Sequence, residues 1–184
     1  MSAIAGRARP TRGFLMELKK RVAFVKEGYR LLELKREELA KTIRTYLDFL
    51  EANRADFEEK VGRSLGRVRA VYAFLGSGEI ESQADSVEGR LEVQVYPKSV
   101  MGCIIPYVKE TRRAEVRLGP VTRSVAKDFN ELIEDLVRMA EVEASIERIA
   151  GELEATNRKV NALEKVVIPE LEQSAKYIAD MLDE

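Results

Sequence analysis

An apolar residue recurs every three or four positions through the first third of the chain, and this repeat constrains the fold more than any other feature. The repeat covers five heptads: Leu15, Leu18, Val22, Val25, Tyr29, Leu32, Arg36, Leu39, Ile43, Tyr46 and Leu50. A 3.5-residue period sustained this long is typical of a supercoiled helix with one narrow buried seam. Arg36 breaks the series, and it either fixes helix register or extends its charged head to solvent.

The start and end of this first long helix have their own signals. Thr11, which follows Pro10, is suited to be the N-cap. A less regular apolar pattern continues to Leu75, where Gly76-Ser77-Gly78 ends the helix. We therefore predict a helix over residues 11–75, preceded by a flexible basic segment at residues 1–10.

A second helix of the same design is predicted over residues 122–184. Its apolar positions are Val142, Ile146, Ile149, Leu153, Thr156, Val160, Leu163 and Val167. The series resumes at Leu171 after an extra four-residue step, a stutter that locally unwinds a coiled coil. The two helices have matched lengths, so the sequence favours a mainly α fold: a long antiparallel two-helix left-handed coiled coil.

The charge distribution favours the antiparallel arrangement. Residues 1–36 carry ten Lys and Arg against three Glu, whereas residues 152–184 carry four against eight acidic residues. Antiparallel packing lays these stretches side by side. Because an exposed ion pair contributes only about 0.2–1 kcal/mol, the charges set register and orientation rather than stability.

Pro169 lies in the same turn as the stutter and predicts a bend. A proline inside a helix deletes one backbone hydrogen bond and clashes with the preceding turn. End-to-end alignment of the two helices places Gly28 opposite, where a missing side chain would admit a close approach or a bend. Our hypothesis is that Gly28 and Pro169 together set a bend or crossing, although Gly28 taken alone fits a tolerated surface position equally well.

The middle segment, residues 76–121, predicts a short β-hairpin at about residues 90–108. Leu91, Val93 and Val95 alternate with polar residues, which suits a half-buried strand. We interpret residues 97–99 as the turn, and Cys103 as the start of a second strand that ends near Val108. The segments 77–89 and 109–121 are expected to be irregular. A lone two-stranded hairpin is marginally stable, so it should lean on the helices or on a partner.

Missing residue types exclude several classes of function. The chain contains no histidine, which excludes the Ser-His-Asp and Cys-His arrangements and histidine zinc sites. Its single cysteine, Cys103, fits a reducing compartment and has the apolar neighbours of a small buried residue rather than a nucleophile. We find no phosphate-binding glycine loop. We therefore predict no catalytic residue, no cofactor and no metal.

Two kinds of partner are also argued against. No apolar run approaches the roughly 20 residues of a transmembrane helix. The net charge of −1 and the lack of a recognition motif disfavour nucleic acid. We expect a cytoplasmic protein without direct membrane insertion, whose association with a membrane would pass through partners.

Three stretches resemble one family. They are NRKVNALEKVVIPELE at residues 157–172, PTRGFLMELKKRVAFVKEGYRLLELKREEL at residues 10–39, and VMGCIIP at residues 100–106. Each is similar to the D subunit of the vacuolar and archaeal-type rotary ATPases. The block at 157–172 is the most specific of the three, because heptads alone do not require it.

The resemblance implies a central-stalk rotor subunit without an active site of its own. In that family the coiled coil enters a hexamer in which catalytic A subunits alternate with non-catalytic B subunits. The small F subunit binds the lower part, and a funnel-like protein (C or d) links the stalk to the membrane ion-pumping ring. Rotation of this shaft would transmit torque between ATP chemistry and proton or sodium-ion transport.

The resemblance also suggests contact residues. Candidates for touching the hexamer are Arg12, Asn157, Arg158, Lys159, Asn161 and Glu164, which would otherwise form a solvated face. Candidates for touching stalk partners lie in the hairpin: Leu91, Val93, Val95, Gly102 and Ile104. Two other functions remain open, a prefoldin-like chaperone subunit with a helical hairpin and a structural or tethering coiled coil. The family block has no reason to exist in the first, and the second needs no β module.

Overall fold

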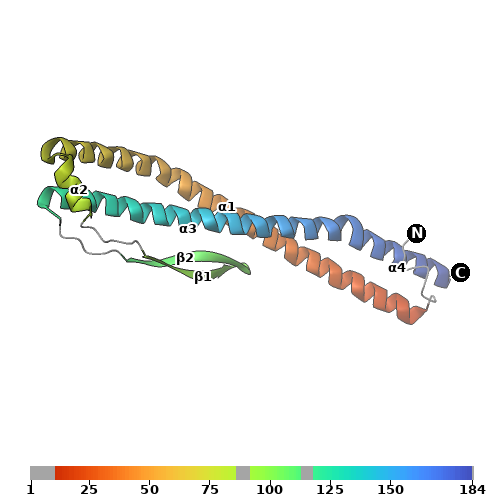
Figure 1. The fold of residues 1–184 in the computed structure, drawn as a ribbon. Helices are drawn as coiled ribbons and strands as arrows, with labels where there is room; N and C mark the ends of the chain where they lie inside the picture. Colours follow the sequence, from red (N-terminus) through yellow and green to blue (C-terminus); the bar gives the residue numbers. More distant parts are fainter. Residues whose placement is uncertain (1–10, 86–91, 113–117, 184) are drawn as a thin grey trace. The chain divides into compact units, whose positions relative to one another are not determined.

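The computed structural model describes residues 11–85, 92–112 and 118–183. The elements in chain order are α1 (Arg12–Leu75), α2 (Ser77–Asp85), β1 (Glu92–Val100), β2 (Cys103–Arg112), α3 (Pro120–Ala162), the π-helical turn η1 (Leu163–Val167) and α4 (Ile168–Asp183) (Figure 1). Long helices with one small antiparallel sheet confirm the predicted fold class. The segment 1–10 and Leu91 lie outside the described residues.

The chain divides into two compact units. Unit 1 comprises Met1–Lys41 and Ala150–Glu184, and unit 2 comprises Thr42–Ile149. Both α1 and α3 contribute residues to each unit.

Both ends of α1 follow from local chemistry. The backbone N–H of Phe14 donates to Thr11 Oγ1 at 3.2 Å, which confirms Thr11 as the N-cap. At the other end Gly76 adopts φ +80°, and its N–H donates to the Tyr72 carbonyl at 3.0 Å. Glycine reaches this left-handed conformation without strain, so the predicted terminator is confirmed.

In unit 1, the beginning of α1 packs against α4. Leu18, Leu171 and Ile178 form a buried cluster, with Val22, Val25 and Val167 among the partly buried residues around it. Every predicted seam position of α1 from Leu15 to Leu39 is buried or half-buried. The 3.5-residue period therefore located the buried face of this helix correctly.

Ion pairs in unit 1 fix the direction of the helices. Lys26 Nζ lies 2.7 Å from Glu172 Oε1, and Lys35 Nζ lies 2.5 Å from Glu152 Oε1. A later residue of α1 thus meets an earlier residue of the opposing helix, which confirms the antiparallel pairing. Arg36 keeps a side chain that is 35% exposed and reaches Glu33 of its own helix at 3.4 Å, as expected if its head points toward solvent.

In unit 2, the second half of α1 lies beside α3, again antiparallel. Lys60 pairs with Asp135, and Arg67 pairs with Asp128. The seam here follows the apolar pattern at Leu132, which is buried, but departs from it elsewhere: Leu65 and Leu136 are exposed, and Ser64 is buried beside Leu65. A straight α-helix drifts by about 20° per heptad relative to a strict 3.5-residue repeat, which moves the buried face onto neighbouring residues.

The sheet is a single antiparallel ribbon in unit 2. Its pairing runs from Val100↔Cys103 to Glu92↔Arg112, with a bulge that leaves Lys109 unpaired. Met101 and Gly102 form the turn, with φ +51° and +79°. Two consecutive positive φ angles are typical of the type I′ turn, whose twist matches that of the strands.

Two predictions for the middle segment are wrong. Residues 97–99 are not a turn but part of β1, where Pro97 lies opposite Pro106. Prolines fit there because residue pairs alternate along an antiparallel ribbon, and this pair belongs to the set without mutual backbone hydrogen bonds. Residues 77–85 are helical rather than irregular, since Ser77 begins α2 directly after Gly76. The second strand extends beyond Val108 to Arg112.

Candidate interaction surfaces

The described residues offer no evident small-molecule or metal site. Among them, no group of three or more acidic or cysteine side chains could hold a metal ion. A hollow of about 320 Å³ between α1 and α3 in unit 2 is lined mostly by charged residues, of which Arg67 pairs with Asp128 across it. In the same described part of the chain, no helix is both long and apolar enough to cross a membrane. The candidate functional surfaces lie on the outside of the helices and hairpin.

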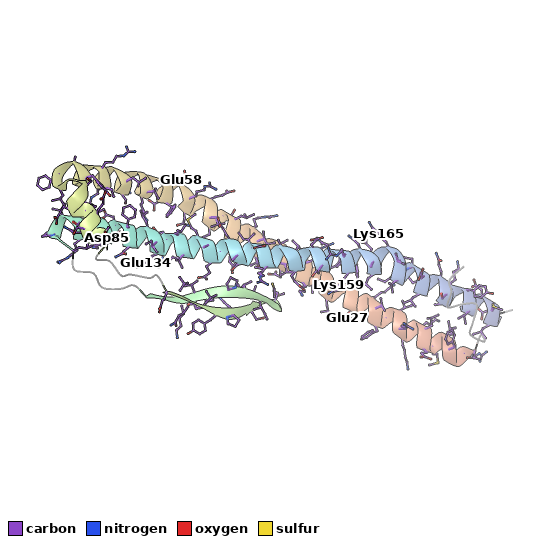
Figure 2. The ribbon with its side chains drawn as sticks, in the orientation of Figure 1. Glu27, Glu58, Asp85, Glu134, Lys159 and Lys165 are labelled. Carbon is purple, nitrogen blue, oxygen red and sulfur yellow. The ribbon has the colours of Figure 1, made fainter. Side chains whose placement is uncertain are left out.

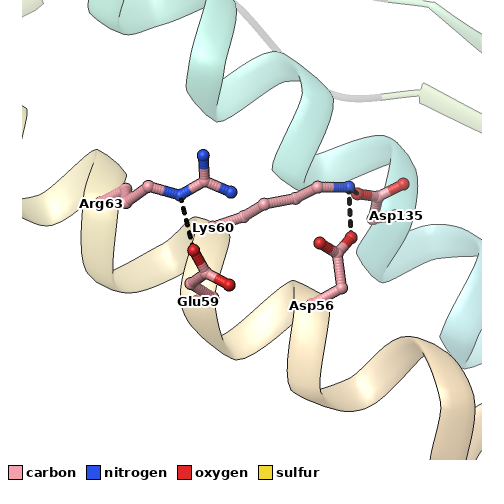
Figure 3. A network of polar contacts seen from close by, with 5 residues as sticks. All are labelled: Asp56, Glu59, Lys60, Arg63 and Asp135. Carbon is pink, nitrogen blue, oxygen red and sulfur yellow. Dashed lines mark hydrogen bonds and ion pairs between the residues drawn. The ribbon is translucent and has the colours of Figure 1, made fainter.

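The charged network of unit 2 fixes the spacing of α1 and α3. Lys60 Nζ lies 2.8 Å from Asp56 and 2.9 Å from Asp135, while Arg63 reaches Glu59 at 3.6 Å (Figure 3). The hydrogen bond from Lys60 to Asp56, followed by that to Asp135, raises the pKa of the Lys60 ammonium. Lys60 therefore connects α1 to α3 while it also pairs with a carboxylate of its own helix.

Four large apolar side chains lie on the outside of α1 in unit 1, away from the seam. We call them the outer stripe; they are Met16, Phe24, Leu31 and Leu34, exposed by 61%, 79%, 59% and 58%. Steps of eight, seven and three residues keep them on one side of a 3.6-residue helix. Scattered exposed apolar residues are ordinary, but a row of large ones on one face is typical of a surface that contacts a partner.

The remaining surface of unit 1 is mostly charged. Exposed charges line both helices, among them Glu27 on α1 and Lys165 on η1 (Figure 2). On the α3 side, the exposed residues between 150 and 165 are predominantly charged, polar or small. Unit 1 therefore presents the apolar outer stripe on α1 and a polar surface on residues 150–165 of the opposing helix, which farther along exposes Val166, Tyr177 and Met181. Sequence analysis missed the outer stripe, although apolar residues off the seam were its visible signal.

The structure places the residues predicted to touch a hexamer on exposed or half-exposed positions. Arg12 is exposed at the first residue of α1. Arg158, Lys159, Asn161 and Glu164 are exposed on α3 and η1, whereas Asn157 is half-buried. Arg158 pairs with Glu154 one turn earlier on its own helix.

Glu164 also acts on the opposing helix. The pKa of the Tyr29 hydroxyl is raised, first by its hydrogen bond to Glu33, then by burial, and then by the negative charge of Glu164. The Tyr29 Oη donates to Glu33 Oε1 at 2.9 Å. The Glu164 carboxylate is therefore close enough to α1 for its charge to reach Tyr29.

The predicted bend coincides with the π-helical turn. In η1, the N–H of Ile168 donates to the Leu163 carbonyl, a bond that spans five residues instead of four. Pro169 follows directly and has no N–H for the Lys165 carbonyl. No residue of η1 is buried, although the seam residues Val160 and Leu171 on either side are.

The structure gives Gly28 no role in close approach. A Cβ built on Gly28 would meet no atom within 4 Å. Lys26 pairs with Glu172, so this part of α1 does lie near the turn that follows Pro169. The bend hypothesis therefore keeps Pro169 and η1, while the proposed need for glycine at position 28 loses its support within the chain itself.

One face of the hairpin is open, and the other is covered around Cys103 and Ile105. Val95 and Ile104 are 58% and 66% exposed, Val93 is also exposed, and Gly102 lies in the exposed turn. Ile105, by contrast, is only 3% exposed. Cys103 is buried, as predicted. The predicted contact residues of the hairpin thus lie on the accessible side, Leu91 being outside the described residues.

Comparison with known proteins places these surfaces in context. The family model of the ATP synthase D subunit matches residues 14–184. The A-type ATP synthase D subunit of Thermococcus sibiricus is 30% identical over 97% of this chain and 87% of its own length. That of Thermococcus gammatolerans is 32% identical over 96% and 86%, and that of Pyrococcus furiosus is 31% identical over 97% and 87%.

Proposed function

Because the chain belongs to the family of ATP synthase D subunits, we propose that it is the rotor shaft that carries torque between the ATP-hydrolysing or ATP-synthesising hexamer and the membrane ion-translocating ring. As a member of this family it is a non-catalytic central-stalk subunit of an A- or V-type rotary ATPase. Family membership disfavours both the chaperone and the tethering interpretation.

The observation that supports a shaft role best is the one-sidedness of unit 1. A rotating part must present different surfaces to three otherwise equivalent catalytic interfaces. Unit 1 has the outer stripe on α1 and a largely charged and polar surface on residues 150–165 of the opposing helix. Apolar side chains contribute binding energy through burial, whereas exposed charges contribute little, so the two faces would bind one ring unequally.

We propose particular partners for each surface. The outer stripe and the exposed charges at Arg158 and Lys159 would face the hexamer of A and B subunits. The open face of the hairpin, with Val95 and Ile104, would face stalk partners: the small F subunit or the funnel-like protein that links to the membrane ring. Membrane attachment would pass through that funnel-like protein.

The outer stripe can be tested with two phenylalanines that are equally exposed. Phe24 in unit 1 is 79% exposed and Phe74 in unit 2 is 78% exposed. We expect Phe24→Ser to weaken binding of the full chain to a reconstituted A/B hexamer by about tenfold, the effect of truncating an aromatic anchor at an interface. Phe74→Ser serves as the control and should bind within about twofold of wild type, by the same reasoning.

If Phe24→Ser binds the A/B hexamer with the same affinity as wild type, the outer stripe is not part of the interface. An equal loss in both variants would point to a general effect of exposed aromatic residues rather than to a specific face. Circular dichroism of the free chains should be identical, because neither side chain contributes to the buried core.

A further inference from the structure

Contacts from the described residues of β2 attach the β-hairpin of unit 2 to α3. The backbone N–H of Val108 donates to Glu141 Oε2 at 3.1 Å. The Cys103 thiol lies 3.6 Å from the Arg148 carbonyl. Ile105, between them in the same strand, is 3% exposed. Figure 1 shows the hairpin running alongside α3.

The bond to Glu141 depends on the register of the ribbon. Residue pairs alternate between those that exchange backbone hydrogen bonds and those that do not. The Val100↔Cys103 pair closes the two-residue turn and belongs to the first kind, so Val95↔Val108 belongs to the second. The Val108 N–H therefore points out of the ribbon, where the half-buried Glu141 carboxylate accepts its hydrogen bond.

Glu141, Ser145 and Arg148 lie one turn apart on one face of α3, and two of them contact β2. Ser145 is 3% exposed, and its hydroxyl donates to the Glu141 carbonyl at 2.7 Å. That hydroxyl is therefore satisfied by its own helix. On this face of α3, the side chain that holds the hairpin backbone is Glu141.

We propose that the hairpin is a releasable arm, held against α3 by the Glu141 carboxylate and by the burial of Ile105. A two-stranded ribbon is only marginally stable alone, so docking and folding of the hairpin are coupled. Loss of these contacts opens it while both long helices stay folded, as expected of a small cooperative unit in which, of residues 92–109, only Cys103 and Ile105 are buried. Release exposes Cys103 and Ile105 and enlarges the apolar surface that the hairpin offers. These contacts all lie within unit 2, so the release is independent of the proposed function.

The chain carries its own probe of this release. Cys103 is the only cysteine of the sequence and is buried while the hairpin is docked. Its reaction with a thiol reagent such as dithionitrobenzoate therefore measures the fraction of time that the hairpin is open. In the full-length wild-type chain, we expect slow labelling whose rate changes little at urea concentrations below the unfolding transition, because a local opening exposes little surface.

A graded series of substitutions at position 141 tests whether the Glu141 carboxylate holds the hairpin against α3. Glu141→Ala should accelerate labelling by about tenfold or more, as expected when a hydrogen bond to a charged acceptor is lost. Glu141→Gln should give an intermediate rate, because its amide oxygen still accepts a neutral hydrogen bond. Glu143→Ala, a change at an exposed glutamate of the same helix, is the matched control and should label at the wild-type rate.

Two results would overturn the proposal. Wild-type labelling that rises with urea as steeply as global unfolding would show that the hairpin opens only when the whole chain does. Equal rates of Cys103 labelling in the Glu141→Ala and Glu143→Ala variants would show that Glu141 does not hold the hairpin. The wild-type measurement remains decisive even where a variant loses helical circular dichroism.

Discussion

At the residue scale, backbone conformation decides where the hairpin turns. The sequence suggested Pro97-Lys98-Ser99, since proline and serine favour turns, but the chain turns at Met101 and Gly102. A non-glycine residue with φ +51° is uncommon, and nothing in the methionine side chain signals it. The presence of a hairpin was therefore predictable from alternation of apolar residues, whereas the position of its turn was not.

Replacing Met101 should improve this turn. Asparagine tolerates the left-handed conformation better than methionine, and Asn-Gly is the preferred type I′ pair. We expect Met101→Asn to stabilise the hairpin by about 0.5–1 kcal/mol. The gain should appear as slower amide hydrogen exchange in β1 and β2 than in the wild-type chain. Gly102→Ala, which places a Cβ at φ +79°, should have the opposite effect. Faster exchange in Met101→Asn would contradict the prediction.

Glu152 should make the chain sensitive to acid. Its hydrogen bond from Lys35 lowers the pKa of the carboxyl below 4.5. A lowered folded-state pKa stabilises the fold above the unfolded value, and this contribution disappears as pH falls below 4.5 through the folded-state pKa. Glu152→Gln should therefore cost about 0.5–1 kcal/mol in urea unfolding at about pH 7 and less at about pH 3.

Glu154→Gln provides the comparison, because the partner of Glu154 is Arg158 on its own exposed helix face. Its effect near neutral pH should be smaller than that of Glu152→Gln. A loss for Glu152→Gln that is the same at both pH values would indicate that the carboxylate charge is not involved.

At the element scale, the second long helix is continuous but irregular at one place. The stutter and Pro169 located the irregularity, because each is a feature of the residue pattern. Its form, a π-helical turn over Leu163–Val167, depends on how the backbone redistributes hydrogen bonds around a missing N–H. Whether Gly28 admits a close approach of the two helices could not be predicted from the sequence, because this depends on the distance between them.

Removing the proline should regularise the helix. Pro169→Ala restores an N–H that can reach the Lys165 carbonyl, so the π turn should convert to α-helix. We expect a gain of about 1–3 kcal/mol, part of the usual cost of an interior proline, seen as a higher thermal midpoint. If the bend matters for the shaft, ATP-driven rotation of the assembled complex should become less efficient.

Pro120→Ala is the appropriate comparison. Pro120 is the first residue of α3, where a missing N–H costs nothing. Its thermal midpoint should stay close to that of wild type. An unchanged midpoint in Pro169→Ala would mean that Pro169 does not maintain the π turn.

At the scale of the whole molecule, the heptad period and the charge gradient predicted a mainly α fold with antiparallel helices. They did not predict the drift of the seam in unit 2, because its course depends on how far the helices supercoil. The family was recognisable from short sequence blocks in both long helices. The outer stripe was not predicted, although its residues lie outside the predicted seam, because single exposed apolar residues are common on helices and do not by themselves indicate a contact surface.

Charge on the opposing helix gives a prediction about assembly. Arg158→Glu should weaken binding to the A/B hexamer, and the dependence of binding on salt should decrease, since exposed charges act mainly through screened electrostatics. Arg54→Glu is the matched control, because Arg54 is likewise exposed and pairs with Glu58 one turn away. Equal binding of the two variants would assign Arg158 to the solvated surface.

Pro97 and Pro106, which lie opposite each other in the hairpin, also protect the chain against aggregation. Exposed strand edges recruit further strands through their outward N–H groups, and β-rich apolar stretches then stack into fibrils. Pro97 and Pro106 remove the outward donor from both edges at one level of the ribbon, and Glu141 occupies the next donor on β2. A segment that carries valine, isoleucine and tyrosine in the open is thereby poorly suited to template aggregation.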